Sequence, residues 1–265
     1  MSTLTVSLVQ TATHWHDPVA NHRHFEALFE QLPADGDLVL LPEMFSTGFT
    51  MASRTQAETM TGPTLAWLHK MARQYQRTFC GSIVVRDDKR YFNRLLWVSP
   101  EGTVEFYDKR HRFRMAGEHE HYDAGSERLV VSLKGWRICP LICYDLRFPV
   151  WSRNSGNEFD LLLYVANWPS PRHEAWQTLL AARAIENQVY VGAVNVVGSD
   201  GNNQQYAGGS GVWGFDGARL AHCGADQAVT SQALSLSSLT QYREGFPAWQ
   251  DGDAFTLNED NPANP

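Results

Sequence analysis

The chain has 265 residues, a length that fits one large domain or two small ones. Hydrophobic residues make up 43% and aromatic residues 12% of the chain, which is enough to build a buried core and excludes a disordered protein. The formal net charge is −7, the opposite of the basic excess that sequence-independent nucleic-acid binding requires. No run of residues approaches the ~20 apolar positions of a membrane span. We therefore expect no nucleic-acid partner and no membrane partner.

The N-terminal sequence and the cysteines predict a cytoplasmic location. Residues 1–17 contain neither the basic segment nor the apolar segment that is typical of a secretory signal. The four cysteines are widely spaced, as reduced thiols usually are, and do not resemble a disulfide framework.

Apolar periodicity predicts alternating strands and helices in the first half of the chain. Residues 4–10 alternate as a strand does, and Phe25, Leu28, Phe29 and Leu32 share one face of a helix. A second helix is expected after the Gly62-Pro63-Thr64 signal, and further strands are expected at residues 37–43, 79–85, 91–99 and 104–109.

The second half repeats this alternation with different residues. Strands are expected at residues 129–133, 136–143, 160–166 and 189–196, and a hairpin is expected over residues 210–215 and 218–223. A short helix is expected after Pro149 and a longer one over residues 173–188. The polar residues 198–209 are typical of a loop.

Alternating strands and helices predict an α/β fold. The two similar halves favour two sheets packed face to face with helices outside, a four-layer α-β-β-α sandwich. No low-complexity linker divides the chain, so we expect one domain over residues 1–243 and a C-terminal surface tail over residues 244–265.

Three of the predicted strands end at a residue that can perform chemistry. These residues are Glu43, Lys109 and Cys143. Ligands of α/β sheets gather outside the carboxyl ends of strands, so a carboxylate, an ammonium and a thiol placed there could meet in one pocket. Taken singly, each has an ordinary explanation: the two charges as surface residues and the thiol as an inert core residue.

Five segments of the chain resemble signatures of the nitrilase (carbon–nitrogen hydrolase) superfamily, in that family's order. They are LPEMFSTGF at 41–49, YDKRHRF at 107–113, LICYDLRFP at 141–149, VANWP at 165–169 and ARAIENQVYV at 182–191. The resemblance covers residues 4–236. It implies a nitrilase-like sandwich, a Glu–Lys–Cys triad made of Glu43, Lys109 and Cys143, and assembly into a homodimer or a larger homo-oligomer. Phe246, Trp249 and Phe255 in the tail could cover a partner subunit or their own domain.

Two of these segments also resemble the omega-amidase branch of the superfamily. They are CYDLRFP and KRHRFRMAGEHEHY. Omega-amidases hydrolyse monoamides of 2-oxo dicarboxylic acids, such as 2-oxoglutaramate and 2-oxosuccinamate, to the 2-oxo acid and ammonia. Another amide hydrolase or an N-carbamoyl hydrolase of the same superfamily is the alternative, and transfer of the acyl group to an amine stays open.

The chemistry of the implied triad is consistent with its residue types. A free thiol has a pKa of about 8.5 and needs a base at neutral pH. In the implied roles, Glu43 moves the proton of Cys143, while Lys109 and the backbone N–H of Tyr144 stabilise the oxyanion. The intermediate is a thioester, and no metal or cofactor is needed.

A second carboxylate, seven residues before a glycine, orients the triad in this family. Counting back from Gly125 selects Glu118, with Glu120 as its competitor. An exposed acidic loop without a catalytic role is the alternative explanation of this segment.

The carboxylate of such a substrate calls for a guanidinium, whose planar fork matches two oxygens. Arg147 and Arg114 are the candidates, and Arg147 could instead pair with Asp145 or Glu186. Four further substrate-binding candidates would complete the pocket: Phe45, Tyr144, Asn167 and Trp168. Asn167 could alternatively cap the end of a strand.

Two other classes of function, a metal-binding protein and a thiol redox protein, are the alternatives to the hydrolase. His111, His119 and His121 lie with several carboxylates in residues 111–123, a mixture that could bind zinc, and an extended HEHY segment would place two histidines on one face. A redox pair of Cys139 and Cys143 is disfavoured because residues four apart in one strand lie about 13 Å from each other. We expect Cys139, Cys80 and Cys223 to be core residues.

Overall fold

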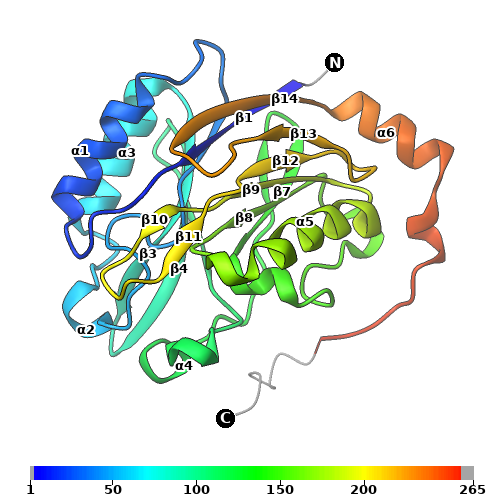
Figure 1. Ribbon diagram of the computed structural model, residues 1–265. Coiled ribbons are helices and arrows are strands. Elements are labelled where there is room, and N and C mark those ends of the chain that lie inside the picture. Colours follow the sequence, from blue (N-terminus) through cyan, green and yellow to red (C-terminus); the bar gives the residue numbers. More distant parts are fainter. Residues whose placement is uncertain (1–2, 258–265) are drawn as a thin grey trace.

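The computed structural model of the protein describes residues 3–257 and contains two six-stranded sheets (Figure 1). In spatial order, the first sheet consists of β14 (Ala228–Ser235), β1 (Thr3–Gln10), β2 (Leu38–Leu40), β3 (Thr78–Asp87), β4 (Arg90–Val98) and β5 (Val104–Asp108). The second sheet consists of β13 (Arg219–His222), β12 (Gly211–Trp213), β9 (Tyr190–Val194), β8 (Leu161–Val165), β7 (Trp136–Ile142) and β6 (Val131–Leu133).

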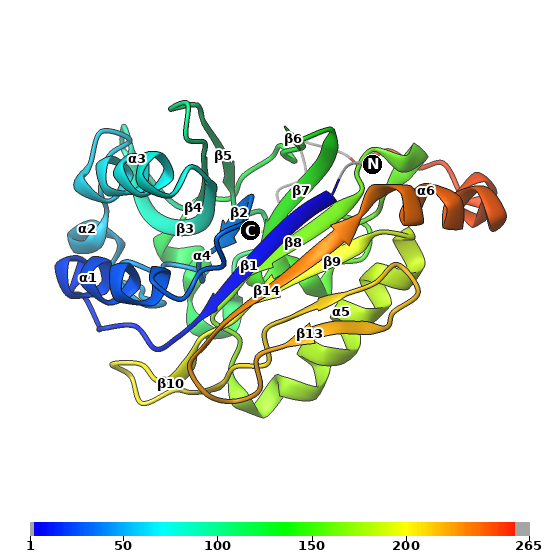
Figure 2. The same cartoon turned by 90° about the horizontal axis from the view of Figure 1, so that it is seen from above.

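Helices cover the outer faces of both sheets. The helices α1 (Pro18–Phe29) and α3 (Pro63–Tyr75) lie on one side of the molecule, and α5 (His173–Asn187) lies on the other (Figure 2). Smaller helices are α2 (Ser53–Gln56), α4 (Glu118–His121) and α6 (Leu236–Gly245). The 3₁₀ turns are η1 (Arg114–Ala116), η2 (Cys143–Arg147), η3 (Ser155–Asn157), η4 (Ser170–Arg172) and η5 (Ala248–Asp251). The predicted four-layer α-β-β-α sandwich is therefore confirmed.

The nearly continuous apolar strands reflect burial on both faces of a sheet. In β1, Leu8 belongs to the core shared with the second sheet, whereas its neighbour Val9 packs in the core beneath α1 and α3. In β2, Leu40 belongs to the first of these cores and Val39 to the second. Successive side chains of a strand point to opposite faces, so one apolar run supplies both cores.

Most predicted elements are present, with shifted ends. The short helix predicted after Pro149 corresponds to the single 3₁₀ turn η3, and the turn η2, which precedes this proline, was not predicted. Phe148 has an extended backbone with φ −112° and ψ 91°, as expected for a residue before proline, and ends the turn. The predicted loop 198–209 contains a hairpin of β10 (Val197–Ser199) and β11 (Gln205–Ala207).

No strand or helix was predicted for residues 228–243. In the structure they form β14 and most of α6, and β14 pairs antiparallel with β1 from Thr3↔Ser235 to Gln10↔Ala228. Only Leu234 in β14 is buried, so this edge strand lacks the apolar pattern that identifies a strand. Within residues 3–257, no helix combines the length and the apolarity needed to cross a membrane.

Candidate active site

Glu43, Lys109 and Cys143 converge between the two sheets, although they are far apart in sequence. Glu43 follows β2, Lys109 follows β5 directly, and Cys143 follows β7 directly. The first two come from one sheet and the third from the other. Their exposed fractions are 0%, 1% and 7%, so the three polar groups are enclosed. The prediction that these three side chains come together at strand ends is confirmed.

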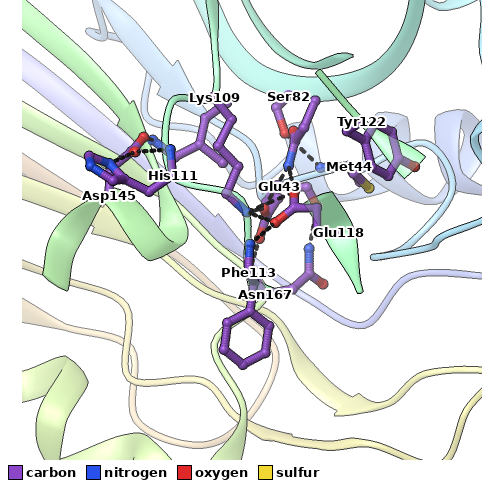
Figure 3. Close-up of polar contacts among 12 residues, drawn as sticks. Glu43, Met44, Ser82, Lys109, His111, Phe113, Glu118, Tyr122, Asp145 and Asn167 are labelled. Atoms are coloured by element: carbon purple, nitrogen blue, oxygen red, sulfur yellow. Dashed lines mark hydrogen bonds and ion pairs between the residues drawn. The ribbon is translucent and has the colours of Figure 1, made fainter. Parts of the chain in front are cut away.

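Lys109 lies between two carboxylates (Figure 3). Its Nζ is 2.7 Å from Glu43 Oε1, and 3.0 and 2.9 Å from the two carboxylate oxygens of Glu118. Burial acts to lower the pKa of Lys109, but the charges of Glu118 and Glu43 outweigh it and raise the pKa above its ordinary value. Lys109 is therefore a fixed cation inside the protein.

Glu118 is placed in this cluster and Glu120 is not. The Glu118 carboxylate is fully buried and also accepts the backbone N–H of Phe113 at 2.5 Å. Burial and the charge of Glu43 raise the pKa of Glu118, whereas the charge of Lys109 lowers it. The net effect is a pKa above the ordinary value of a glutamate. The Glu120 side chain is 69% exposed. Of the two candidates, Glu118 is therefore the one that contacts Lys109.

Asn93, which the sequence analysis did not select, joins the two carboxylates. Its Nδ2 donates to Glu43 Oε1 at 2.7 Å and is 3.3 Å from Glu118 Oε1. Asn93 lies in the centre of β4 and is 1% exposed. An amide followed by the apolar run of residues 95–98 in a predicted strand was the available signal, because buried polar groups need partners.

Asn167 holds Glu43 from the opposite sheet. Its backbone N–H donates to Glu43 Oε2 at 2.9 Å, and its side-chain Nδ2 donates to the Glu43 carbonyl at 2.5 Å (Figure 3). Asn167 follows β8, so these two hydrogen bonds join a strand end of the second sheet to Glu43, which follows β2 of the first. Both Glu43 oxygens are thus oriented by donors.

Cys143 is the first residue of η2 and has an unusual backbone conformation. Its φ of +42° lies in the left-handed region, which costs a non-glycine residue roughly 1–3 kcal/mol and is common where function requires it. Burial raises the pKa of the Cys143 thiol well above its usual value. Glu43, which is within hydrogen-bond reach of the thiol, raises it further, and Lys109 opposes this. Cys143 is thus a protonated thiol beside a carboxylate.

Asp145 ties the loop after Lys109 to the turn that holds Cys143. Its buried carboxylate accepts the N–H of Ile142 at 3.0 Å and the hydroxyl of Tyr107 at 2.8 Å. The same group binds the backbone N–H of His111 at 3.1 Å and its Nδ1 at 2.8 Å. Asp145 is fully occupied by these donors and does not pair with Arg147, which was one explanation considered for that arginine.

A cavity of about 260 Å³ opens above this cluster. Lys109 and Cys143 line it together with four of the residues predicted to bind substrate: Tyr144, Arg147, Asn167 and Trp168. Its other polar lining residues are Arg172, Asp200, Asn202, Gln204 and Tyr206, most of them from the β10–β11 hairpin. The hairpin contribution was missed because a Gly- and Asn-rich segment is typical of a surface loop.

Two of the predicted substrate-binding residues lie elsewhere. Phe45 is fully buried in the core beneath α1 and α3, where its ring packs against Phe25 and Trp67. Arg114 is exposed and lines a neighbouring cavity of about 270 Å³. Neither residue is among those that line the cavity above Cys143.

The segment considered for zinc has a different geometry from the one expected. Residues 118–121 form the helical turn α4, so the prediction of an extended segment with both histidines on one face is wrong. His111 binds Asp145 and stacks on Phe148. Across residues 3–257, no group of three or more His, Cys, Asp or Glu side chains is arranged to hold a metal ion.

The other three cysteines lie outside the cluster, and all four are free thiols. Cys80 and Cys139 are buried, as expected for core residues. Cys223 is only partly buried and packs against the edge of the core shared by the two sheets.

The chain is similar to characterised proteins along nearly its whole length. It is 49% identical to omega-amidase YafV of Escherichia coli, over 97% of this chain and 100% of that one. It is 33% identical to the 2-oxoglutaramate amidase of Bacillus subtilis, over 93% and 96% of the two chains. The structure superposes with a TM-score of 0.95 and 48% identity on a CN-hydrolase superfamily protein of Xanthomonas campestris that has an arsenic adduct in its active site, covering 97% of this chain and 100% of that one.

The family model for carbon-nitrogen hydrolases matches residues 5–244. This match covers most of the chain and agrees with the sandwich fold and with the resemblance found in the five sequence segments. The protein therefore belongs to the carbon-nitrogen hydrolase family, within the nitrilase superfamily.

Proposed function

We propose that this protein is an omega-amidase that hydrolyses the terminal amide of a small 2-oxo dicarboxylic acid monoamide, with Cys143 as its nucleophile. The observation that carries the proposal is the position of Cys143, beside Glu43 in a small cavity that Lys109 also lines. The similarity to omega-amidase YafV and to 2-oxoglutaramate amidase supports the substrate class.

In the acylation step, Glu43 accepts the proton of Cys143 as the sulfur attacks the amide carbonyl carbon. The raised pKa of Cys143 keeps the thiol protonated until this moment, so the base must lie within reach, as Glu43 does. Lys109 and the backbone N–H of Tyr144 then stabilise the negative oxygen of the tetrahedral intermediate. When the intermediate collapses, the C–N bond breaks, Glu43 returns the proton to the leaving nitrogen, and ammonia departs from the thioester.

In the deacylation step, Glu43 takes a proton from a water molecule that attacks the thioester carbonyl. Lys109 stabilises the second oxyanion, and the C–S bond breaks to release the 2-oxo acid. The proton held by Glu43 returns to the sulfur, which restores the Cys143 thiol. Glu118 acts on Lys109 by keeping its ammonium in place through two contacts. A covalent nucleophile such as Cys143 divides the hydrolysis into acylation and deacylation, and each of these two steps is easier than direct attack of water on the amide.

The residues that line the cavity orient the substrate. We assign the terminal carboxylate to Arg147, whose guanidinium lies 4.9 Å from the centre of the Trp168 ring. This stacking limits the orientation of the guanidinium plane and leaves its edge for two carboxylate oxygens. Tyr144 and Asn167, which line the cavity together with Cys143, are the other residues that we assign to substrate binding.

An ammonia-release assay tests the proposal. The substrates are 2-oxoglutaramate, 2-oxosuccinamate, glutamine, asparagine and an N-carbamoyl amino acid. The proposal predicts the highest kcat/KM for the two oxo-acid amides. Preference for the N-carbamoyl compound would assign the protein to another branch of the superfamily.

Three further proposals concern the oligomeric state, the location in the cell and the division of the chain. We propose a homodimer or a larger homo-oligomer, in which exposed apolar residues such as Phe246 contact a second subunit. We also propose a cytoplasmic location and a division of the chain into a hydrolase domain, 1–243, and a tail, 244–265. Sedimentation analysis of the full chain tests the first of these.

A further inference from the structure

The enclosed arginines among residues 3–257 each have strong acceptors. Arg94 binds Asp108, Arg183 binds Glu186, and Arg243 binds Asp160. The remaining one, Arg77, donates to the backbone carbonyls of Pro33 and Ala34. Burying a guanidinium without such a partner is costly, so an arginine that lacks one is informative.

The arginines that line the cavity above Cys143 are Arg147 and Arg172. Neither has a carboxylate within ion-pair distance among residues 3–257, although both are half-buried. Arg172 ends η4, and its guanidinium lies 5.3 Å from the centre of the Phe113 ring. Its Nη2 is 2.7 Å from Met115 Sδ, and a thioether is a weak acceptor that a carboxylate oxygen would replace.

The cavity also contains little negative charge that could offset these two arginines. Among its described lining residues, Asp200 is the one with a carboxylate. Asp200 Oδ1 accepts the backbone N–H groups of Asn202 and Gln204 at 2.8 and 3.0 Å, and Oδ2 accepts the hydroxyl of Tyr206 at 2.9 Å. Asp200 therefore shapes its own loop, and the wall of the cavity presents two guanidinium groups that lack an ionic partner within residues 3–257.

We propose that Arg172 is a second substrate-binding arginine that, together with Arg147, selects 2-oxo acid amides over 2-amino acid amides. This inference rests on the proposed function and specifies its substrate. The far end of a 2-oxo acid has three acceptor oxygens and no donor, which suits two groups that only donate. A 2-amino acid amide carries an ammonium in place of the oxo oxygen, and two nearby guanidinium groups repel it.

Kinetics of the Arg172→Gln variant test this role. A lost hydrogen bond to a charged group predicts a KM for 2-oxoglutaramate that is roughly 10- to 100-fold higher. The kcat/KM for butyramide, a neutral amide of similar length, is expected to stay within about twofold. The preference for 2-oxoglutaramate over glutamine is expected to fall. Arg23→Gln, a change at an exposed position on α1, is the matched control and is expected to match the wild type.

A binding measurement tests the role of Arg172 without requiring catalytic turnover. Titration of 2-oxoglutarate into Cys143→Ala and into the Cys143→Ala, Arg172→Gln double variant is expected to show at least a tenfold weaker Kd in the latter. Equal affinities, or an equal loss of activity toward butyramide and 2-oxoglutaramate, would overturn the role of Arg172. If the wild type does not hydrolyse 2-oxoglutaramate, the proposed function fails, and the binding comparison still decides whether Arg172 recognises the anion. Arg172→Lys, which keeps the charge and loses the fork, tests the same contact if the glutamine variant does not fold.

Discussion

Asn93 Nδ2 lies 2.7 Å from Glu43 Oε1, so an amide in the centre of β4 fixes the carboxylate that faces Cys143. The same nitrogen is 3.3 Å from Glu118. Two buried carboxylates thus share one neutral donor in addition to Lys109. We infer that Asn93 is a positioning residue for the base.

Replacement of Asn93 by Ala tests this role. We expect kcat to fall about tenfold, because Glu43 loses the donor that orients it, while KM stays nearly unchanged. Steady-state kinetics and the melting temperature Tm of the same preparation provide the measurement. A variant that is less stable but turns over normally would assign Asn93 a purely structural role.

The Glu43→Gln and Lys109→Met variants test the two charged members of the cluster. Each is expected to lose at least ~10² in kcat, since the first removes the base and the second removes an oxyanion partner. Lys109→Met also leaves Glu43 and Glu118 buried without their cation, so its Tm is expected to fall. A near-normal rate in either variant would remove that residue from the mechanism.

The Arg147→Lys variant separates substrate binding from structure. The ammonium keeps the charge but cannot offer a planar fork or the same stacking on Trp168. We expect KM for 2-oxoglutaramate to rise about tenfold and KM for butyramide to change far less. Equal effects on both substrates would mean that Arg147 only supports the cavity wall.

His22 makes stability depend on pH at a distance from the active site. Its ring stacks on Trp67 at 4.5 Å, and its Nε2 lies 3.1 Å from Thr64 Oγ1. Burial lowers the pKa of His22 to about 4, although Glu26 opposes this. Because the unfolded chain binds the proton more readily, the contribution of His22 is complete above pH 6.5 and is lost as the pH falls toward 4.

A His22→Phe variant, which keeps an aromatic ring on Trp67, measures this contribution. The free energy of unfolding of the wild type is expected to fall more steeply than that of the variant between pH 6.5 and 4.5. Urea unfolding at several pH values gives both slopes. If the unfolding free energies of the wild type and the variant changed equally with pH, burial would not lower the pKa of His22.

The sequence predicts the fold well where apolar patterning is strong. Strands such as β3 and β8 are buried on both faces, so their apolar runs identify them. The weakly patterned edge strand β14 and the hairpin β10–β11 carry no such signal, because their pairing partners are distant in sequence or their residues are polar. The turn η2 before Pro149 was missed because its start depends on the carboxylate of Asp145, a contact that periodicity does not show.

The same limit applies to the candidate site. Glu43, Lys109, Glu118 and Cys143 were identified from motifs, and their convergence follows from strand ends in two adjacent sheets. Arg172 was missed because it lies outside any strand end and becomes relevant only when η4 places it over Phe113. Phe45 was misplaced because its position next to Glu43 in sequence says nothing about which face of the sheet it joins.

Ammonia release from 2-oxoglutaramate by the Cys143→Ala variant tests the central claim most directly. The wild type and the variant are compared at equal concentration, after circular dichroism has shown that both are folded. The account predicts that release falls to the uncatalysed rate, because Cys143 is the one thiol among the described residues that line the cavity. Turnover by the folded variant at a rate near that of the wild type would contradict the account.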